Sequence, residues 1–264
     1  MTPQYGVAVA DLVGGFAVWD MWGRLGWQEI KRRYRRTVIG PFWATLSLGV
    51  FISVLGVVWA RLWQQDPKVY LPFLTSGMLV WSLIQTIVNE GCMVFIGGES
   101  FIKQMAFPYS MLCWSVIWRN FIVFGHNLLI FVAVAVYGAV PVTSATPLAV
   151  LGLVLLAVNG VWVATLLGMA CARFRDIYQV VTSLLQISMF VTPIFFTREQ
   201  LGTRVAALAD WNLLYHYVDI VRAPMLGQYP ATRSWIMVAA ATIGGWSLTL
   251  GLYSRFRRRV PYWL

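Results

Sequence analysis

The chain has 264 residues, of which 59% are hydrophobic and 11% are charged, whereas a water-soluble domain carries about 25% charged residues. A soluble fold cannot bury this much apolar surface, so the composition predicts an all-α protein within a lipid bilayer. The net charge of +10 would suit a nucleic-acid partner only on a polar scaffold. The cations lie instead in short clusters between apolar runs, which argues against nucleic-acid binding.

The first predicted element is an amphipathic helix over residues 16–36. Its apolar face, at about 100° per residue, comprises Phe16, Trp19, Trp22, Trp27, Ile30 and Tyr34. Most cations lie on the opposite face, but Arg33 lies on the apolar side and breaks the pattern. A basic, Trp-rich helix typically lies in the membrane plane. The same cations would also serve as an ordinary topology signal for the segment that follows.

Long stretches without charge predict the membrane spans. Four of them hold 21 to 24 residues without Asp, Glu, Lys or Arg, and a helix needs about 20 residues to cross the bilayer core. A fifth stretch, 120–172, is too long for one crossing, and a turn at "PVTSATP" (141–147) divides it. The sequence therefore predicts six spanning helices, over residues 37–60, 69–95, 109–137, 147–172, 177–197 and 234–254.

The basic residues predict the orientation of these spans. If both termini lie on one side, thirteen Lys and Arg residues flank the spans there, and six flank them on the other side. Cytoplasmic loops carry the excess of positive charge. We therefore expect both termini in the cytoplasm.

The connection "GGESFIKQMAFPYS" (97–110), between the second and third spans, predicts more than a turn. The two glycines would end one helix and Pro108 would begin the next. A short helix between them would pair Glu99 with Lys103 one turn later. A passive turn is the alternative.

Residues 198–232 join the last two predicted spans on the other side. The part "ALADWNLLYHYVDIVRAPML" is too apolar for a solvated loop. Short helices that partly re-enter the membrane, covered by other protein, would explain this composition.

Arg119 is predicted to lie deep in the third span, about 15 Å from its end at 1.5 Å per residue. A charge at this depth is costly and usually faces a bundle interior or an aqueous cavity. Glu90, near the end of the second span, is the candidate partner. Two interpretations remain open, an ion pair that joins two helices and a site for an anionic substrate.

Motifs for catalysis and for nucleotide or metal binding are absent from the sequence. None of the three lysines, Lys31, Lys68 and Lys103, stands in a GxxxxGK[ST] motif, so a Walker-type nucleotide site is excluded. The three cysteines are widely spaced, and neither HExxH nor an acidic cluster is present. We therefore expect a protein that is not an enzyme and holds no metal or cofactor. Any ATP would be hydrolysed by a partner.

Two motifs resemble those of a known family. "RYRRTVIGPFW" (33–43) resembles the RY-R-S-x-LG-x-LW motif before the first span of bacterial ABC-2 polysaccharide export permeases. "RFRDIYQVVTSLLQISMFVTPIFF" (173–196) resembles their second signature, and the resemblance covers residues 16–264. The chain departs at Thr37 and Val38, where Ser and a small or apolar residue are usual. It also lacks the Pro that often follows Asn212.

The resemblance implies a single ABC-2 transmembrane domain over residues 1–264, multi-pass in the bacterial cytoplasmic (inner) membrane. It implies a homodimer with two ATP-binding cassette ATPase subunits, which bind ATP and Mg²⁺. The substrate would be a glycan on a polyprenyl-pyrophosphate carrier, as in O-antigen, capsule or teichoic acid export. An exporter of small hydrophobic compounds is the first alternative. The second is a membrane glycosyl- or phosphotransferase, which should show acidic metal-binding clusters.

The resemblance also implies roles for particular residues. Residues 16–36 would form an interface helix on the ATPase, and a coupling helix would follow between the second and third spans. Residues 198–232 would form an external gate. The predicted coupling residues are Trp19, Trp22, Glu99 and Lys103, and the predicted gate residues are Trp211, Tyr215, Tyr217 and Arg222.

Two further hypotheses concern the substrate. Aromatic faces suit sugar rings because they combine apolar area with a polar handle, although helical aromatics more often pack in a core. The candidate channel aromatics are Trp81, Trp114, Trp118, Tyr137 and Phe195. Guanidinium groups pair well with phosphate oxygens, so Arg33, Arg36 and Arg119 are the candidates for the pyrophosphate headgroup.

Overall fold

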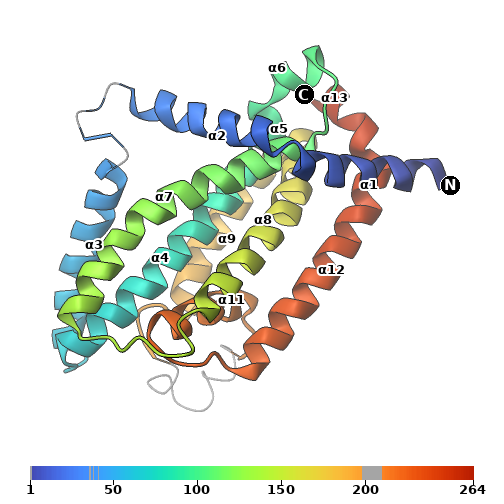
Figure 1. Cartoon of the computed structure of the whole chain (residues 1–264). Helices are drawn as coiled ribbons and strands as arrows, with labels where there is room; N and C mark the ends of the chain where they lie inside the picture. The colour runs from blue at the N-terminus through green and yellow to red at the C-terminus, as the bar shows by residue number, and fades with distance from the viewer. Residues whose placement is uncertain (1, 36, 38, 41, 198–209) are drawn as a thin grey trace.

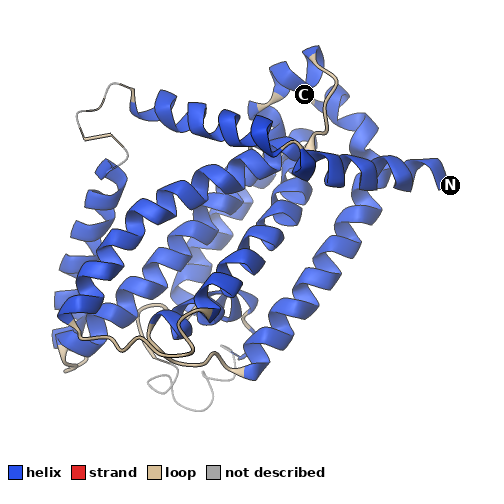
Figure 2. Ribbon diagram, in the orientation of Figure 1, coloured by secondary structure: helices blue, strands red, loops and turns tan. Residues whose placement is uncertain are grey.

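The part of the chain that the structure describes consists of helices joined by loops and contains no strand (Figures 1 and 2). The structure, a computed structural model, describes residues 2–35, 37, 39–40, 42–197 and 210–264. In chain order the helices are α1 (Thr2–Ala17), α2 (Trp19–Tyr34), α3 (Phe42–Leu62), α4 (Pro67–Cys92), α5 (Val94–Gly97), α6 (Glu99–Gln104), α7 (Ser110–Tyr137), α8 (Leu148–Arg173), α9 (Ile177–Val191), α11 (Leu213–Met225), α12 (Thr232–Phe256) and α13 (Val260–Trp263), with a 3-10 turn at Arg257–Arg259.

Five of the described helices are long and apolar enough to cross a membrane. They are α3, α4, α7, α8 and the helix that runs from α12 into α13. Four of the predicted spans, 69–95, 109–137, 147–172 and 234–254, agree with α4, α7, α8 and α12 to within a few residues. This pattern is that of a multi-pass membrane protein.

The predicted span over 177–197 is wrong as a continuous helix. Its helical part, α9, has 15 residues and ends at Val191. Thr192 is extended, at φ −83° and ψ 132°, because the residue before a proline avoids the helical region and Pro193 has no N–H to donate. A helix of this length is about 22 Å long, which is short of the hydrocarbon core. The described residues therefore give five candidate spans where the sequence predicted six.

Two further boundaries correct the predictions at the N-terminal end. The first span begins at Phe42 rather than residue 37, because Gly40 has a positive φ of 62° that ends helical geometry. The predicted helix over 16–36 is broken at Val18, so Phe16 belongs to α1 and α2 begins at Trp19. Helix α1 itself was not predicted.

Helix α4 forms the centre of the bundle. In its most apolar stretch 67% of residues are buried, against 17% in α3 and in the helix from α12 to α13. It packs against α3, α7, α8, α9 and α11. Polar side chains on α4 are therefore held inside the protein, where they need partners from other helices.

The two ends of the bundle differ. Helices α1 and α2 lie across one end, which also carries α6, α13 and both termini (Figure 1). We call it the basic end, because α2 and the turn before α13 carry clusters of arginine there. The opposite end carries the α3–α4 turn, the α7–α8 loop and α11.

Helix α11 explains why the connection before α12 is so apolar. Residues 216–225 of this helix are all buried, and it packs against α8, α12 and α4. Asn212 caps its first turn by accepting a hydrogen bond from the Leu214 amide at 3.0 Å. Of the predicted gate segment, residues 198–209 lie outside the described residues.

Candidate functional site: an arginine–glutamate network at the basic end

Helix α2 contacts α7 through the tryptophan face that its periodicity predicted. The Trp22 ring stacks on Trp114 and meets the edge of Trp118, with centroids 6.1 Å and 6.0 Å apart. One turn later Gly26 lies against α7, and a Cβ at this position would come within 3.1 Å of the Ser115 carbonyl oxygen. The glycine lets the two backbones approach closely, so Glu29 and Arg33 on the next two turns of α2 come within reach of charged groups on α7 and α4.

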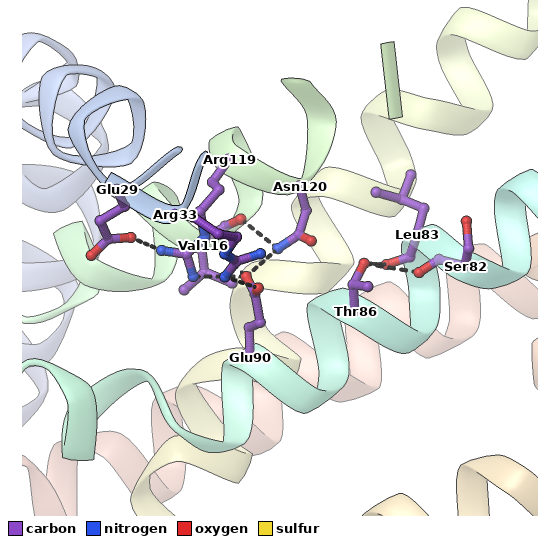
Figure 3. A network of polar contacts seen from close by, with 9 residues as sticks. All are labelled: Glu29, Arg33, Ser82, Leu83, Thr86, Glu90, Val116, Arg119 and Asn120. Carbon is purple, nitrogen blue, oxygen red and sulfur yellow. Dashed lines mark hydrogen bonds and ion pairs between the residues drawn. The ribbon is translucent and has the colours of Figure 1, made fainter. Parts of the chain in front are cut away.

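Glu90, near the end of α4, is the centre of a polar network that these turns complete (Figure 3). Its Oε1 accepts a hydrogen bond from Arg33 Nη2 on α2 at 2.8 Å. Its Oε2 accepts from Arg119 on α7, through Nε at 3.0 Å and Nη2 at 2.7 Å, and from Asn120 Nδ2 at 2.7 Å. Arg119 Nη1 also forms an ion pair with Glu29 of α2. The structure thus pairs Arg119 with Glu90 and adds two partners from α2.

This network explains why Arg33 broke the amphipathic pattern. It lies on the inward face of α2 because Glu90 is there to receive it. Burial lowers the pKa of the Arg33 guanidinium, but the hydrogen bond and charge of Glu90 outweigh burial and raise that pKa above its usual value. Arg33 therefore stays charged. Arg36, predicted beside it, lies outside the described residues.

A cavity of about 540 Å³ adjoins the network, between α2, α7 and the α4–α6 segment. Sites for small ligands have volumes of roughly this size, 300–1,000 Å³. The charged groups that line the cavity are Glu29, Arg32, Arg33, Glu90 and Arg119. Ser115 lines it too, and its hydroxyl is buried without a hydrogen-bond partner among the described residues. The cavity thus offers three guanidinium groups and an unused hydroxyl.

The predicted short helix after α4 is present as α6. Lys103 Nζ bonds to Glu99 Oε1 at 2.6 Å, and both side chains are a little under half exposed. The hydrogen bond and charge of Lys103 lower the pKa of Glu99. Helix α6 projects from the basic end beside α13 (Figure 1). On α2, Trp19 is 68% exposed, so both predicted coupling elements present free surface at this end.

The predicted gate residues lie at the opposite end. Arg222 is buried, donates from Nη1 to the Pro193 carbonyl at 2.6 Å and lies over the Phe73 ring at 4.5 Å. It lines a cavity of about 710 Å³. The other gate residues are Tyr215, which lines the same cavity, Tyr217, which is buried, and Trp211, which is exposed.

The predicted channel aromatics do not share one surface of the chain. Two are buried in the core, two contact α2 although one of these, Trp118, is 42% exposed, and one is exposed away from α2. In that order they are Trp81 and Phe195, Trp114 and Trp118, and Tyr137. Their role in a channel stays a prediction.

Sequence reasoning missed a second carboxylate at the basic end, Asp11 of α1. It accepts hydrogen bonds from the backbone amides of Tyr109 at 3.0 Å and Ser110 at 3.1 Å. It also accepts from the Tyr253 hydroxyl at 2.8 Å and Arg257 Nε at 2.7 Å. The available signal was an isolated acidic residue within an apolar stretch. Asp11 joins α1 to the start of α7 and the end of α12.

Comparison with known proteins adds two findings. Residues 22–226, from α2 to the loop after α11, match the family model described as "ABC-2 type transporter". The chain is also 25% identical over 170 residues to the "O-antigen export system permease protein RfbA" of Myxococcus xanthus. That alignment covers 64% of this chain and 65% of the relative, just under two thirds of its length.

The family match spans more than half of the chain and includes both helices that carry the arginine network. It also includes α4, which supplies Glu90, and α6. The resemblance inferred from the two sequence motifs is thereby confirmed at the level of the family. The chain belongs to the ABC-2 type transporter family of membrane permeases.

Proposed function

We propose that the chain is the membrane subunit of an ATP-driven exporter of a polyprenyl-pyrophosphate-linked polysaccharide, O-antigen-like or capsular. Family membership supports transport across a membrane, and the relative named as an O-antigen export permease supports a polysaccharide substrate. Two copies of the chain act with two ATP-binding cassette subunits, which bind ATP and Mg²⁺. The basic end faces the cytoplasm of the bacterial inner membrane.

The arginine network carries this proposal within the structure. A polyprenyl-pyrophosphate carrier presents two phosphate groups near the inner membrane surface, and guanidinium groups bind phosphate oxygens in a planar, bidentate way. Arg33 and Arg119 meet at a cavity at the basic end. The headgroup would bind there, with Arg36 beside it in sequence.

The path of the chain after α9 supports six crossings rather than five. Helix α9 starts at the basic end, directly after α8, and the carbonyl of Pro193 accepts from Arg222 on α11 at the opposite end. Residues 177–193 therefore connect the two ends of the bundle, and the chain leaves α9 through an extended Thr192.

Exposed apolar faces support the dimer. Helix α3 exposes Val54 and Val58, and α9 exposes Ile187 and Phe190, each at more than half of its surface. Such side chains are stable against lipid or against a second copy. The same copy would complete a channel, and ATP-driven closure of the two ATPase subunits would push on α6 and α2.

Charge reversal at Arg33 and Arg36 tests the headgroup site. We expect export of lipid-linked glycan from vesicles containing both subunits to fall at least about tenfold, which corresponds to 1.4 kcal/mol of lost binding. Stimulation of ATP hydrolysis by the lipid-linked glycan should disappear as well. Arg24→Glu is the matched control, because Arg24 is exposed on the same helix and its ion pair among the described residues is with Asp20. Export and stimulation that survive the double reversal would contradict the assignment.

A further inference from the structure

We propose that Glu90 is an intramolecular competitor that keeps monoanionic membrane lipids off Arg33 and Arg119, so that only a dianionic headgroup displaces it. This inference rests on the proposed function, because it takes the network as the pyrophosphate site. It assigns Glu90 a role in specificity rather than in holding two helices together.

Glu90 already occupies the donors that a phosphate would use. One carboxylate oxygen receives Arg33 and the other receives Arg119, at 2.8 Å and 2.7 Å. The two arginines come from different helices, so the carboxylate bridges α2 and α7 as a phosphate group would. An anion that takes the Nε and Nη2 donors of Arg119 together with Nη2 of Arg33 must therefore first remove Glu90.

Such a competitor would improve selectivity, because the surrounding membrane lipids also carry phosphate groups that can bind arginine. Anionic lipids are attracted to basic segments by about 1 kcal/mol per Lys or Arg near the surface. Anionic lipids with one phosphodiester, such as phosphatidylglycerol, carry a single negative charge and far outnumber any lipid-linked glycan. Unoccupied arginines at the membrane surface would be filled by these lipids, and the rarer substrate would have to displace them.

The charges of the cavity set the threshold for displacement. Three guanidinium groups and two carboxylates line it, which gives a net charge of +1. A monoanion that replaces Glu90 brings the cavity back to the same net charge of +1, but Glu90 has then lost its arginine partners. The exchange therefore has no net electrostatic benefit. A pyrophosphate diester carries two charges, and replacing Glu90 with it brings the lining to neutrality. Only the dianion therefore gains enough electrostatic attraction to the three guanidinium groups to compensate for separating Glu90 from its arginine partners.

The cavity also has room for this exchange. Its volume of about 540 Å³ lies directly beside the network, and the unpartnered hydroxyl of Ser115 is a donor for an incoming oxygen. Glu90 has 21% of its side chain exposed and Arg33 has 50%. The released carboxylate therefore reaches water without crossing the core, which keeps the cost of displacing it low.

Binding of farnesyl-pyrophosphoryl N-acetylglucosamine, a pyrophosphate diester with two negative charges, to the full chain in nanodiscs tests the inference. The nanodiscs contain either phosphatidylcholine alone or an equal mixture with phosphatidylglycerol, which supplies the monoanion. Glu90→Gln keeps the size and the acceptor oxygen but removes the charge. In phosphatidylcholine we expect this variant to bind the probe about tenfold more tightly than the wild type. In the mixture its advantage should vanish, because phosphatidylglycerol now competes for the arginines.

The comparison is made between variants, since the negative surface of the mixture repels the probe equally in all of them. Asp20→Asn is the matched control, because it removes an exposed carboxylate of α2 whose ion pair, within the part of the chain that the structure describes, is with Arg24. It should behave as the wild type does. Glu29→Gln, which removes the other carboxylate on Arg119, is the second variant and should change binding in the same direction.

The outcomes separate this inference from the proposed function. If phosphatidylglycerol weakens binding equally in the wild type and in Glu90→Gln, the competitor role is wrong while the headgroup site stands. If the wild type shows no saturable binding, or Arg33→Glu leaves binding unchanged, the headgroup site is wrong and the inference falls with it.

Discussion

Asp11 and Glu90 are both carboxylates at the basic end, and each joins three helices through an arginine, but their surroundings are opposite. The Asp11 side chain is 1% exposed, and two of its donors are backbone amides at the start of α7. The Glu90 side chain is 21% exposed, and its donors are all side chains. Asp11 is enclosed, whereas Glu90 lines a cavity.

The difference shows that the kind of donor decides whether a carboxylate keeps its hydrogen-bond partners or can be replaced on them by another anion. The first amides of a helix have no partner within it and carry partial positive charge, so Asp11 satisfies donors that cannot move. Side-chain donors such as Arg33 can turn to another acceptor. We therefore interpret the Asp11 centre as a structural joint and the Glu90 centre as a place where a ligand can compete.

Asp11→Ala should produce the largest effect on stability. It leaves Arg257, the Tyr253 hydroxyl and two amides without their acceptor, and breaking a buried pair in this way costs roughly 3–5 kcal/mol. We expect a much lower melting temperature of the purified chain and less protein in the membrane. Glu90→Gln is the comparison variant, and its melting temperature should fall less. Equal losses would mean that the two centres do not differ as we interpret them.

Replacing Arg119 or Arg257 by lysine should show which centre affects substrate stimulation and which affects stability. Lysine keeps the charge but loses the planar fork. Arg119→Lys cannot reach Glu29 and Glu90 together, so we expect stimulation of ATP hydrolysis by the lipid-linked glycan to fall about tenfold, equivalent to 1.4 kcal/mol. Arg257→Lys keeps one contact with Asp11 and should lower stability by about 1 kcal/mol while leaving stimulation intact. If Arg257→Lys instead lowered stimulation and Arg119→Lys lowered only stability, the Asp11 centre would be the ligand site and the Glu90 centre the structural joint.

The Glu90 centre was partly visible in the sequence, whereas of the Asp11 centre only the isolated carboxylate was visible and none of its partners. Charges in long apolar runs are conspicuous, so Arg119 and Glu90 could be paired from sequence. Arg33 was visible only as an exception to the periodicity of α2, and its reason became clear from its contact with Glu90, 57 positions away. The Asp11–Arg257 pair joins residues 246 positions apart, and nothing local predicts such a contact.

The same distinction holds for the fold. Spans are encoded locally by composition, and four of the six predicted spans agree with the structure. The helix over 177–197 was predicted too long because an uncharged run does not show that Pro193 ends it. The missed helix α1 contains three glycines, which weaken its own helical preference. Contacts with α7 and α12 hold it instead.

Two glycines of α2 test whether the hydrogen bonds of Glu90 depend on close contact between α2 and α7, and their substitution is expected to have the smallest effects. Alanine favours a helix over glycine by about 1 kcal/mol. A Cβ at Gly23 would meet no atom within 4 Å, so Gly23→Ala should be stabilising by up to this amount. A Cβ at Gly26 would lie 3.1 Å from the Ser115 carbonyl oxygen and 3.1 Å from the Trp118 ring. Because a backbone oxygen cannot turn aside, α2 must move away from α7.

Gly26→Ala should therefore lose the stabilisation that Gly23→Ala gains, a difference of about 1 kcal/mol in paired melting experiments. Moving α2 also draws Arg33 and Glu29 away from Glu90 and Arg119. We expect glycan-stimulated ATP hydrolysis to fall in Gly26→Ala and to be unchanged in Gly23→Ala. If both variants gain stability and keep full stimulation, the network tolerates a displaced α2. The close approach of α2 to α7 would then have a structural role only, like the enclosed Asp11 centre.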